Sequence, residues 1–255
     1  MTRYTTDTLD LRNCDNMELM RQFPDNHFAL AIVDPQYGIG EDGSKAASRC
    51  RSAGEVNCGF RVGGNTLKSY KPFAGNDKEP PSPAFFRELK RVSRNQIIWG
   101  ANHFIDRIPN PASPCWVIWD KLNGDSDFAD CEMAYTSFKT AVRRFSYRWN
   151  GMLQEDMANK EKRIHPTQKP VALYKWLLAK YAKPGDNILD THLGSCSIAI
   201  ACHYAGHHLT GCELDPDYFA AGCARVARET TQQAFEFSQP LIPPPRETST
   251  ALSLF

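Results

Sequence analysis

The sequence predicts an α/β fold in which a mixed central sheet is flanked by helices. Short apolar runs alternate with segments of helical periodicity, and most of these runs are apolar at every position, as in strands covered on both faces. The 255 residues suffice to bury the core of one domain. No run reaches the roughly 18 apolar residues that a membrane span needs, and the first residues lack the apolar stretch of a signal peptide. We therefore expect a cytoplasmic protein that does not enter a membrane.

The expected elements follow one another along the chain with turn residues between them. The expected strands cover residues 28–33, 96–99, 115–119, 142–149, 187–189 and 209–212. All of them except 142–149, in which polar residues alternate, are interpreted as buried strands. Apolar residues at helical spacing predict helices over 83–92 and 171–181.

Two segments do not fit this pattern. Residues 41–75 are rich in Gly, Ser, Asn, Lys and Arg, and between Ser44 and Lys71 they carry six basic residues against one acidic residue. A loop of this length within a domain is usually functional or mobile, so we expect a mobile basic loop. Residues 237–255 contain Pro243-Pro-Pro245 and are expected to form a disordered, Pro-rich tail, which leaves 1–236 as the single domain.

The nine cysteines predict neither a disulfide framework nor a zinc module, because they are odd in number, scattered, and include no Cys-x-x-Cys pair. The Cys and His residues between Cys196 and Cys212 fall across an expected helix, turn and strand without the spacing of metal ligands. We expect no bound metal. The total charge does not indicate a binding partner, because 30 basic and 29 acidic residues give a net charge of only +1.

The first segment that carries chemistry is Asp34-Pro35-Gln36-Tyr37, directly after the expected strand 28–33. In an open α/β sheet, the loop that leaves the carboxyl end of a strand faces the ligand crevice. Asp34 and the Pro35 carbonyl are hydrogen-bond acceptors, and Tyr37 adds a flat ring. Two acceptors could hold both hydrogens of the exocyclic amine of a nucleobase and free its lone pair, while the ring stacks on the base. A common Asp-Pro turn is the alternative interpretation.

The second segment predicts a nucleoside-binding half of the sheet. The expected strand 187–189 is followed by Asp190, a tight turn at Gly194 and the start of a helix, which brings backbone close to a nucleotide-like ligand. The next strand, 209–212, ends at Glu213, where a carboxylate can hold ribose hydroxyls. This arrangement alone is compatible with NAD or with S-adenosylmethionine.

A third segment separates these two ligands. His165-Pro-Thr167-Gln-Lys169-Pro170 opens the expected helix 171–181. Together the three segments resemble the motifs of the β-type amino-specific DNA methyltransferases, which methylate adenine N6 or cytosine N4 with S-adenosylmethionine. The catalytic segment precedes the cofactor segment, as in the β type, and the resemblance covers roughly residues 10–228. It implies a Rossmann-like S-adenosylmethionine-dependent methyltransferase fold.

The resemblance also implies a role for each matching residue. The catalytic segment that grips the target amine is Asp34, Pro35, Gln36 and Tyr37. The implied cofactor-binding residues are Asp15, Thr167, Lys169, Asp190, His192, Leu193, Gly194, Ser195 and Glu213. Thr167 and Lys169 match positions that approach the carboxylate end of the cofactor, and Glu213 matches the ligand of the ribose hydroxyls. For Lys169, a solvated position at the start of a helix is the alternative.

Two residues depart from the family pattern. Gln36 replaces a proline, which is expected to lower the rigidity of the loop but removes no acceptor. Cys196 replaces a glycine, and its Cβ is expected to crowd the cofactor. A catalytically weakened protein that binds DNA or a sliding clamp is therefore an alternative.

Basic segments are expected to hold double-stranded DNA while a base is flipped out of the helix. They are the loop 41–75 and the stretch 139–163, which carries seven basic residues against three acidic residues, and the acidic stretch 120–132 offsets them in the total charge. The terminal Leu252-Ser-Leu-Phe255 resembles the short peptides by which bacterial replication proteins bind the sliding clamp. A chance apolar terminus is the alternative.

The expected function is therefore site-specific transfer of a methyl group from S-adenosylmethionine to adenine N6 of a flipped base in double-stranded DNA. The resemblance implies an adenine-specific DNA methyltransferase of the restriction-modification or phage-like kind. Cytosine-N4 methylation is the alternative, because Asp-Pro-x-Tyr segments occur in enzymes of both kinds. Methylation of RNA or of a protein glutamine uses similar segments, but usually with the cofactor loop before the catalytic motif. Relatives often dimerise, so a homodimer is expected from the resemblance alone.

Overall fold

The computed structural model describes residues 2–40, 76–123, 129–150 and 153–237 of the chain. The strands in these ranges are β1 (Arg3–Thr5), β2 (Leu9–Asn13), β3 (Phe28–Val33), β4 (Ser93–Trp99), β5 (Trp116–Asp120), β6 (Cys131–Thr136), β7 (Arg143–Ser146), β8 (Trp149–Asn150), β9 (Leu153–Gln154), β10 (Asn187–Asp190) and β11 (His208–Glu213). The α-helices are α1 (Asn16–Met20), α3 (Pro83–Val92), α4 (Val171–Tyr181), α5 (Ser197–Ala205) and α6 (Pro216–Phe237).

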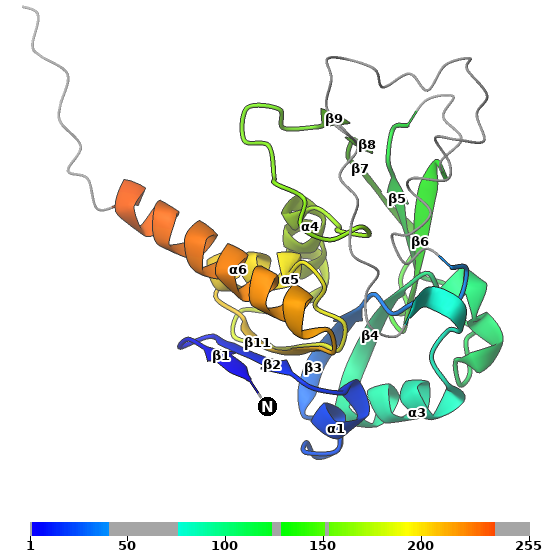
Figure 1. The fold of residues 1–255 in the computed structure, drawn as a ribbon. Coiled ribbons are helices and arrows are strands. Elements are labelled where there is room, and N and C mark those ends of the chain that lie inside the picture. The colour runs from blue at the N-terminus through cyan, green and yellow to red at the C-terminus, as the bar shows by residue number, and fades with distance from the viewer. Residues whose placement is uncertain (1, 41–75, 124–128, 151–152, 238–255) are drawn as a thin grey trace, which may run out of the picture.

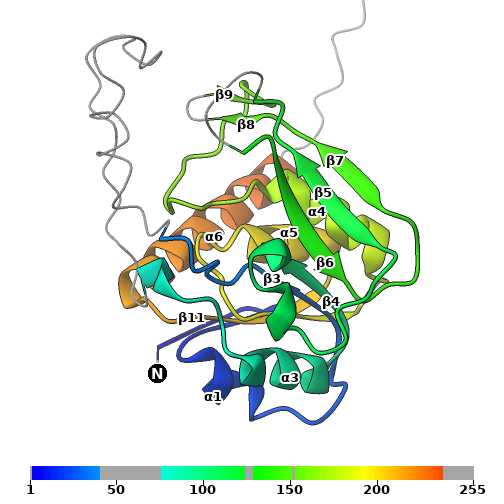
Figure 2. The same ribbon diagram turned by 90° about the vertical axis from the view of Figure 1, so that its right-hand side faces the viewer.

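Within the described residues, nine strands form one sheet in the order β1-β2-β11-β10-β3-β4-β6-β5-β7, and β8 pairs only with β9. The strands from β2 to β4 in this order run parallel, whereas β1 and β6 are antiparallel to their neighbours in it. Helices α1 and α3 lie on one side of the sheet, and α4, α5 and α6 lie on the other (Figures 1 and 2). The expected α/β fold with a mixed central sheet flanked by helices is confirmed.

The direction of the chain across the sheet reverses between β3 and β10. From β3 the chain continues through β4 toward β6, β5 and β7, and from β10 it continues to β11 on the other side. Ligands of open α/β sheets bind outside the carboxyl ends of the strands at such a reversal. The carboxyl ends of β3 and β10 carry the segments that begin with Asp34 and Asp190, so both chemical motifs meet at this point.

The apolar run of β3 is buried on both faces. Leu30 and Ile32 belong to the core beneath α4, α5 and α6, whereas Ala31 and Val33 belong to the core beneath α1 and α3. Because successive side chains of a strand point to opposite faces, a strand between two helical layers needs apolar residues at every position. This confirms the interpretation of 28–33 as a buried strand, in which only Ala29 is half-buried.

Both predicted helices form within the predicted bounds, at Pro83–Val92 and Val171–Tyr181. The start of α3 is fixed by Ser82, whose hydroxyl accepts a hydrogen bond from the backbone N–H of Phe85, and by Pro83 in the first turn, where no backbone donor is needed. Inside the described ranges, no helix is both long enough and apolar enough to cross a membrane.

Other expectations need correction. The segment 115–119 is not buried throughout, because Trp116 and Ile118 of β5 are half-buried on the outer part of the sheet. The expected strand 142–149 is divided into β7 and the start of β8. The expected elements also did not include β1, β2, β6 or α6. Residues 41–75 and 238–255 lie outside the described residues, so the basic loop, the tail and the domain limits stay predictions.

Candidate active site

The Asp34 carboxylate, directly after β3, is bound by two side chains. Its Oδ1 accepts a hydrogen bond from the Tyr37 hydroxyl at 2.8 Å, and its Oδ2 accepts one from Lys169 Nζ at 2.6 Å. Lys169 Nζ lies 3.0 Å from Glu132 Oε2 as well, and the Lys169 side chain is only 3% exposed. The solvated alternative for Lys169 is therefore wrong. We call Asp34, Tyr37, Glu132 and Lys169 the Asp34 cluster.

The ring of Tyr37 is held by backbone and by a second ring. It stacks on His103 with 5.3 Å between ring centroids and 17° between the planes. Gly100, which follows β4, has φ +67°, and a Cβ there would lie 2.1 Å from the Tyr37 ring. Only glycine fits this position, both for its left-handed backbone and for the close approach of the ring. Of the rest of the segment, Pro35 is buried and Gln36 half-buried.

Charges alternate through the Asp34 cluster. Burial lowers the pKa of Lys169, but Asp34 and Glu132 more than offset it, so the pKa is raised and the ammonium persists. Burial raises the pKa of Glu132, yet Lys169 and Lys121 lower it to about 2. The second of these, Lys121 Nζ, lies 2.5 Å from Glu132 Oε1. Burial raises the pKa of Asp34, with Lys169 opposing and Glu132 reinforcing the shift.

The nucleoside half of the predicted site is pre-shaped around Glu213 at the end of β11. Its Oε2 accepts a hydrogen bond from the Gly194 backbone N–H at 2.8 Å, and its Oε1 accepts one from the Asp215 backbone N–H at 2.9 Å. Gly194 has φ +48°, as expected for a tight glycine turn. Burial raises the pKa of Asp190 to about 8, with a further contribution from the charges of Asp34 and Glu213. The three carboxyl groups therefore influence one another across the carboxyl ends of β3, β10 and β11.

Other predicted residues of the loop after β10 face in different directions. Leu193 is a core residue, packed so closely on Gly211 of β11 that a Cβ there would lie 2.7 Å from Leu193 Cδ2. His192 faces α1 and α3, with Nε2 at 3.1 Å from Asn16 Nδ2 and its ring edge-on to Phe85. The partners of both side chains therefore lie outside the Asp34 cluster.

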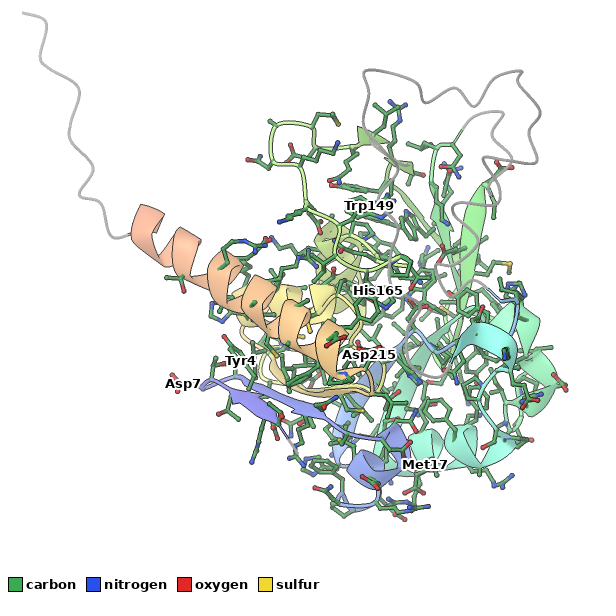
Figure 3. All side chains as sticks on the ribbon, in the orientation of Figure 1. Tyr4, Asp7, Met17, Trp149, His165 and Asp215 are labelled. Atoms are coloured by element: carbon green, nitrogen blue, oxygen red, sulfur yellow. The ribbon has the colours of Figure 1, made fainter. Side chains whose placement is uncertain are left out.

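Asp15 and Thr167 also lie apart from the Asp34 cluster. The Asp15 carboxylate caps α1 by accepting hydrogen bonds from two backbone N–H groups. Thr167 is exposed, and its hydroxyl lies 3.1 Å from His165 Nδ1. The His165 ring meets Tyr218 edge-on at 4.4 Å between centroids, and Figure 3 shows it close to Asp215 at the start of α6. The His-Pro-Thr segment therefore lies against the predicted nucleoside-binding half, and Lys169 reaches Asp34.

Comparison with known proteins identifies the family. The model of a DNA methylase family, the N6/N4 methyltransferases, matches residues 73–223, more than half of the 255-residue chain. The chain belongs to this family. The matched region contains Glu132, Lys169 and Asp190, whereas Asp34 lies before it.

Individual relatives of the chain are distant. The DNA adenine methyltransferase YhdJ of Escherichia coli (strain K12) is 36% identical over 62 residues, which are 24% of this chain and 21% of that protein. The chain spans less than a quarter of the length of the curated relatives that it matches.

Two solved structures share the fold of the chain. The M1.HpyAVI-SAM complex has a TM-score of 0.50 at 15% identity and covers 86% of this chain and 98% of that one. The PvuII DNA methyltransferase (cytosine-N4-specific) has a TM-score of 0.52 at 12% identity and covers 90% of this chain and 93% of that one. At these identities the likeness shows the fold alone, and the Rossmann-like methyltransferase fold is confirmed.

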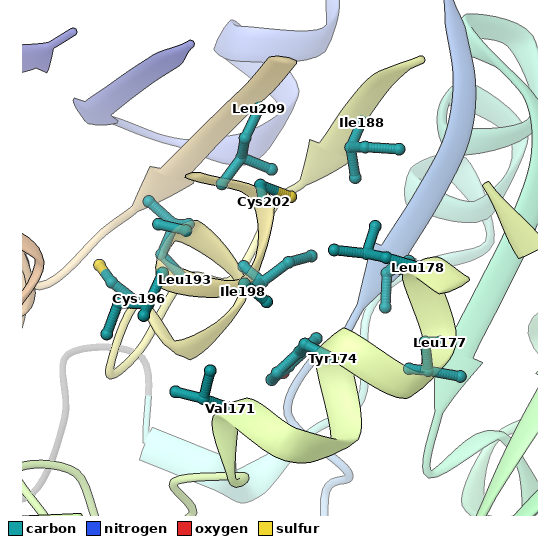
Figure 4. Close-up of a cluster of buried hydrophobic side chains, with 14 of the residues drawn as sticks. Val171, Tyr174, Leu177, Leu178, Ile188, Leu193, Cys196, Ile198, Cys202 and Leu209 are labelled. Carbon is teal, nitrogen blue, oxygen red and sulfur yellow. The ribbon is translucent and has the colours of Figure 1, made fainter. Parts of the chain in front are cut away.

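Cys196, which replaces a glycine of the family pattern in the predicted cofactor loop, has φ 58°. A residue other than glycine pays about 1–2 kcal/mol for this left-handed conformation. The Cys196 side chain is buried, its sulfur directed away from α4 (Figure 4). It fills the space above Gly222 of α6, where a Cβ would lie 2.5 Å from Cys196 Sγ. The thiol is thus accommodated by α6, and the crowding of a cofactor by the Cys196 Cβ stays a prediction.

A buried ion pair that the sequence motifs do not indicate supports the predicted cofactor loop. Arg225 of α6 is fully buried and donates hydrogen bonds to the Ser195 carbonyl at 3.0 Å and to the Ser197 hydroxyl at 2.9 Å. Its Nη2 lies 2.6 Å from Glu161 Oε2, and Glu161 Oε1 accepts the backbone N–H of Val171. Arg225 therefore ties the loop to α6 and, through Glu161, to the start of α4. The position of Arg225 within the apolar face of a helix is the feature of the sequence that indicates a buried partner.

In the described parts of the chain, no group of three or more His, Cys, Asp or Glu side chains is arranged to hold a metal ion. The cysteines in these parts are free thiols.

Proposed function

We propose that this chain transfers a methyl group from S-adenosylmethionine to adenine N6 in double-stranded DNA. The observation that carries the proposal is the meeting of two half-sites at the carboxyl ends of adjacent strands β3 and β10. One half is Asp34 with Tyr37, and the other is Asp190 with the Gly194 turn and Glu213. Membership of the DNA methylase family supports the same conclusion.

The residues at this position fit a cationic cofactor. S-adenosylmethionine carries a sulfonium and an ammonium, and when bound it supplies an activated methyl group. Asp190 is buried and Glu213 is half-buried, and burial raises the pKa of each carboxyl group because it disfavours the charged form. A bound cation would offset this cost by stabilising the carboxylates. Glu213 would hold the ribose hydroxyls, and the Gly194 turn leaves the backbone open to close approach. A cofactor co-crystallised with M1.HpyAVI supports this choice.

Asp34 would hold the target amine and orient its lone pair. Both Asp34 oxygens already accept one hydrogen bond, from Tyr37 and from Lys169, but a carboxylate has about four acceptor positions, so capacity remains. Methyl transfer forms the nitrogen–carbon bond and breaks the sulfur–carbon bond, and the amine then loses one proton, for which Asp34 is the adjacent acceptor. The Tyr37 ring, held by Gly100 and His103, is the surface on which the base would stack.

A surface for the DNA backbone is supported by the stretch 139–163. Six of its basic side chains are exposed: Lys139, Arg143, Arg144, Arg148, Lys160 and Lys162. The acidic Glu161 is turned inward to Arg225, so it offsets less of this exposed charge than the sequence count suggests. Arg163 instead lies over the Trp149 ring, 4.6 Å from its centroid. Exposed cations of this kind neutralise phosphates and release counterions.

The choice of adenine is supported by the relative YhdJ, which is named as a DNA adenine methyltransferase. Cytosine N4 has the same kind of conjugated amine, and Asp34 and Tyr37 could hold either. A homodimer is proposed from the family resemblance alone. Binding to a sliding clamp is proposed through Leu252-Ser-Leu-Phe255, which lies outside the described residues.

Incubation of the purified chain with tritiated S-adenosylmethionine and unmethylated duplex DNA tests the proposal. We expect label in the DNA, and hydrolysis to nucleosides followed by mass spectrometry should identify N6-methyladenine. N4-methylcytosine would replace the adenine assignment and keep the enzyme class. Absence of label in a protein that binds S-adenosylmethionine would leave the alternative of a DNA- or clamp-binding module.

We expect the affinity for S-adenosylmethionine to rise with pH up to about 8. Burial, and then Asp34 and Glu213, raise the pKa of Asp190 to about 8, so the free protein holds this proton at neutral pH. A bound cation favours the carboxylate, so binding releases the proton and tightens as pH rises through the pKa. In Asp190→Asn the group stays neutral and this contribution is lost. Calorimetric titrations between about pH 6 and pH 9 measure the affinity of the wild type and of Asp190→Asn for S-adenosylmethionine. The titration of the cofactor itself affects both proteins equally, so it cancels in the difference between them. Affinities that change equally with pH in the two proteins would contradict the expectation.

A further inference from the structure

In the Asp34 cluster, the ammonium of Lys169 forms ion pairs with two carboxylates. Lys169 Nζ lies 2.6 Å from Asp34 Oδ2 and 3.0 Å from Glu132 Oε2. The Tyr37 hydroxyl, which donates to Asp34, lies 3.5 Å from Glu132 Oε2. Glu132 comes from β6, between β4 and β5 in the sheet, and belongs to none of the three sequence motifs.

The charge of Lys169 works against methyl transfer. As the new nitrogen–carbon bond forms, the target amine becomes cationic, and a carboxylate stabilises this charge less strongly when another cation already neutralises that carboxylate. Asp34 paired with a buried ammonium at 2.6 Å has no net charge. Because Lys169 is only 3% exposed, solvent screens its charge little.

We propose that Glu132 is a positioning residue for methyl transfer, which offsets the charge of Lys169 and so leaves the Asp34 side of the site negative toward the target amine. This inference rests on the proposed function. Glu132 shares the Lys169 ammonium with Asp34, and its Oε2 lies 3.5 Å from the Tyr37 hydroxyl. It therefore contacts both side chains that donate hydrogen bonds to Asp34.

Lys121 holds Glu132 from the other oxygen without cancelling this effect. Lys121 Nζ lies 2.5 Å from Glu132 Oε1, and the Lys121 side chain is 18% exposed against 3% for Lys169. Its charge is therefore more screened and acts on the far oxygen of Glu132. Of the other groups whose charges act on Asp34, Tyr174 is neutral, because burial raises its pKa well above the usual value, and Asp190 belongs to the cofactor half.

Glu132→Gln tests the proposal, because it removes the charge and keeps the shape and a hydrogen-bond acceptor. We expect kcat for DNA methylation to fall about 10- to 100-fold, with little change in KM for DNA or in the dissociation constant of S-adenosylmethionine. Loss of the like charge should also lower the pKa of Asp34, so the acid limb of the kcat–pH profile should move to lower pH. A merely structural role would lower activity without moving this limb.

Glu88→Gln is the matched control. Glu88 of α3 is ion-paired to Arg91 at 2.7 Å and 18% exposed, close to the 23% of Glu132, but it lies outside the site. We expect its kcat and pH profile to equal those of the wild type.

A second variant separates charge from shape. In Glu132→Gln combined with Lys169→Met, the uncompensated ammonium is also gone, so kcat should recover part of the loss seen in Glu132→Gln alone. The proposal requires the pH shift and the partial recovery together. A Glu132→Gln variant with wild-type kcat, an unmoved acid limb or a further loss in the double variant overturns it. A wild-type protein that transfers no methyl group refutes the proposed function instead.

Discussion

Asp34→Asn should lower the rate of methyl transfer by at least about a thousandfold. The amide keeps the shape of the side chain but offers one neutral acceptor in place of a carboxylate, so it can neither balance a cationic amine nor take its proton. It also leaves Lys169 with Glu132 as its remaining carboxylate partner, so the local charge becomes more positive. Single-turnover assays with radiolabelled S-adenosylmethionine and duplex DNA measure this step directly.

Cofactor binding should survive this change. Glu213 and the Gly194 turn are held by their own hydrogen bonds, independent of Asp34. Asp25→Asn is the control, because Asp25 is 71% exposed and pairs with Arg91 away from the site, and we expect it to keep full activity. An Asp34→Asn protein that methylates DNA within tenfold of the wild-type rate would show that Asp34 is not the amine acceptor.

Arg225→Met should reduce the free energy of unfolding by about 3–5 kcal/mol, the usual cost of removing one partner from a buried ion pair. Arg225 is fully buried, and its loss leaves Glu161, whose side chain is 15% exposed, without its closest cation. Burial already raises the pKa of Glu161, and Arg225 is the main group that opposes the shift. Urea denaturation followed by circular dichroism measures the difference.

The same substitution should weaken cofactor binding, since the Ser195 carbonyl and the Ser197 hydroxyl both lose a donor. Arg228→Met is the matched control on the same helix. Arg228 is 50% exposed and pairs with the partly exposed Glu229, an interaction typically worth less than about 1 kcal/mol. Equal loss of stability in the two variants would mean that the buried position of Arg225 is not what matters.

The sequence was sufficient to predict those parts of the fold whose pattern is local. The helices α3 and α4 and the strand β3 follow from the spacing of their own apolar residues and agree with the structure in their bounds. The positions of Asp34 and Gly194 follow from the same logic, because each comes directly after a buried strand or its turn.

Residues whose role depends on distant parts of the chain escaped prediction. In the sequence, Glu132 stands out only as a member of an acidic stretch. Nothing near it in the sequence indicates that Lys169 Nζ lies 3.0 Å from its Oε2. Likewise, the resemblance implies a cofactor contact for Lys169, which stays a prediction, but the sequence does not indicate that its ammonium donates a hydrogen bond to Asp34. Strand β6 was missed because its Glu132 and Thr136 interrupt the apolar pattern, and only pairing with β4 and β5 makes it a strand.

The pairing of early and late strands has a consequence for how the protein is made. Leu30 of β3 aligns with Ile188 of β10, and Leu9 of β2 aligns with Leu209 of β11. During translation, the edges of β2 and β3 therefore lack these partners until the last third of the described chain has left the ribosome. Contacts so far apart in sequence slow folding, and unpaired apolar strands are prone to aggregate. We expect nascent chains that end before β10 to be bound by chaperones, whereas those that extend beyond β11 become resistant to proteases.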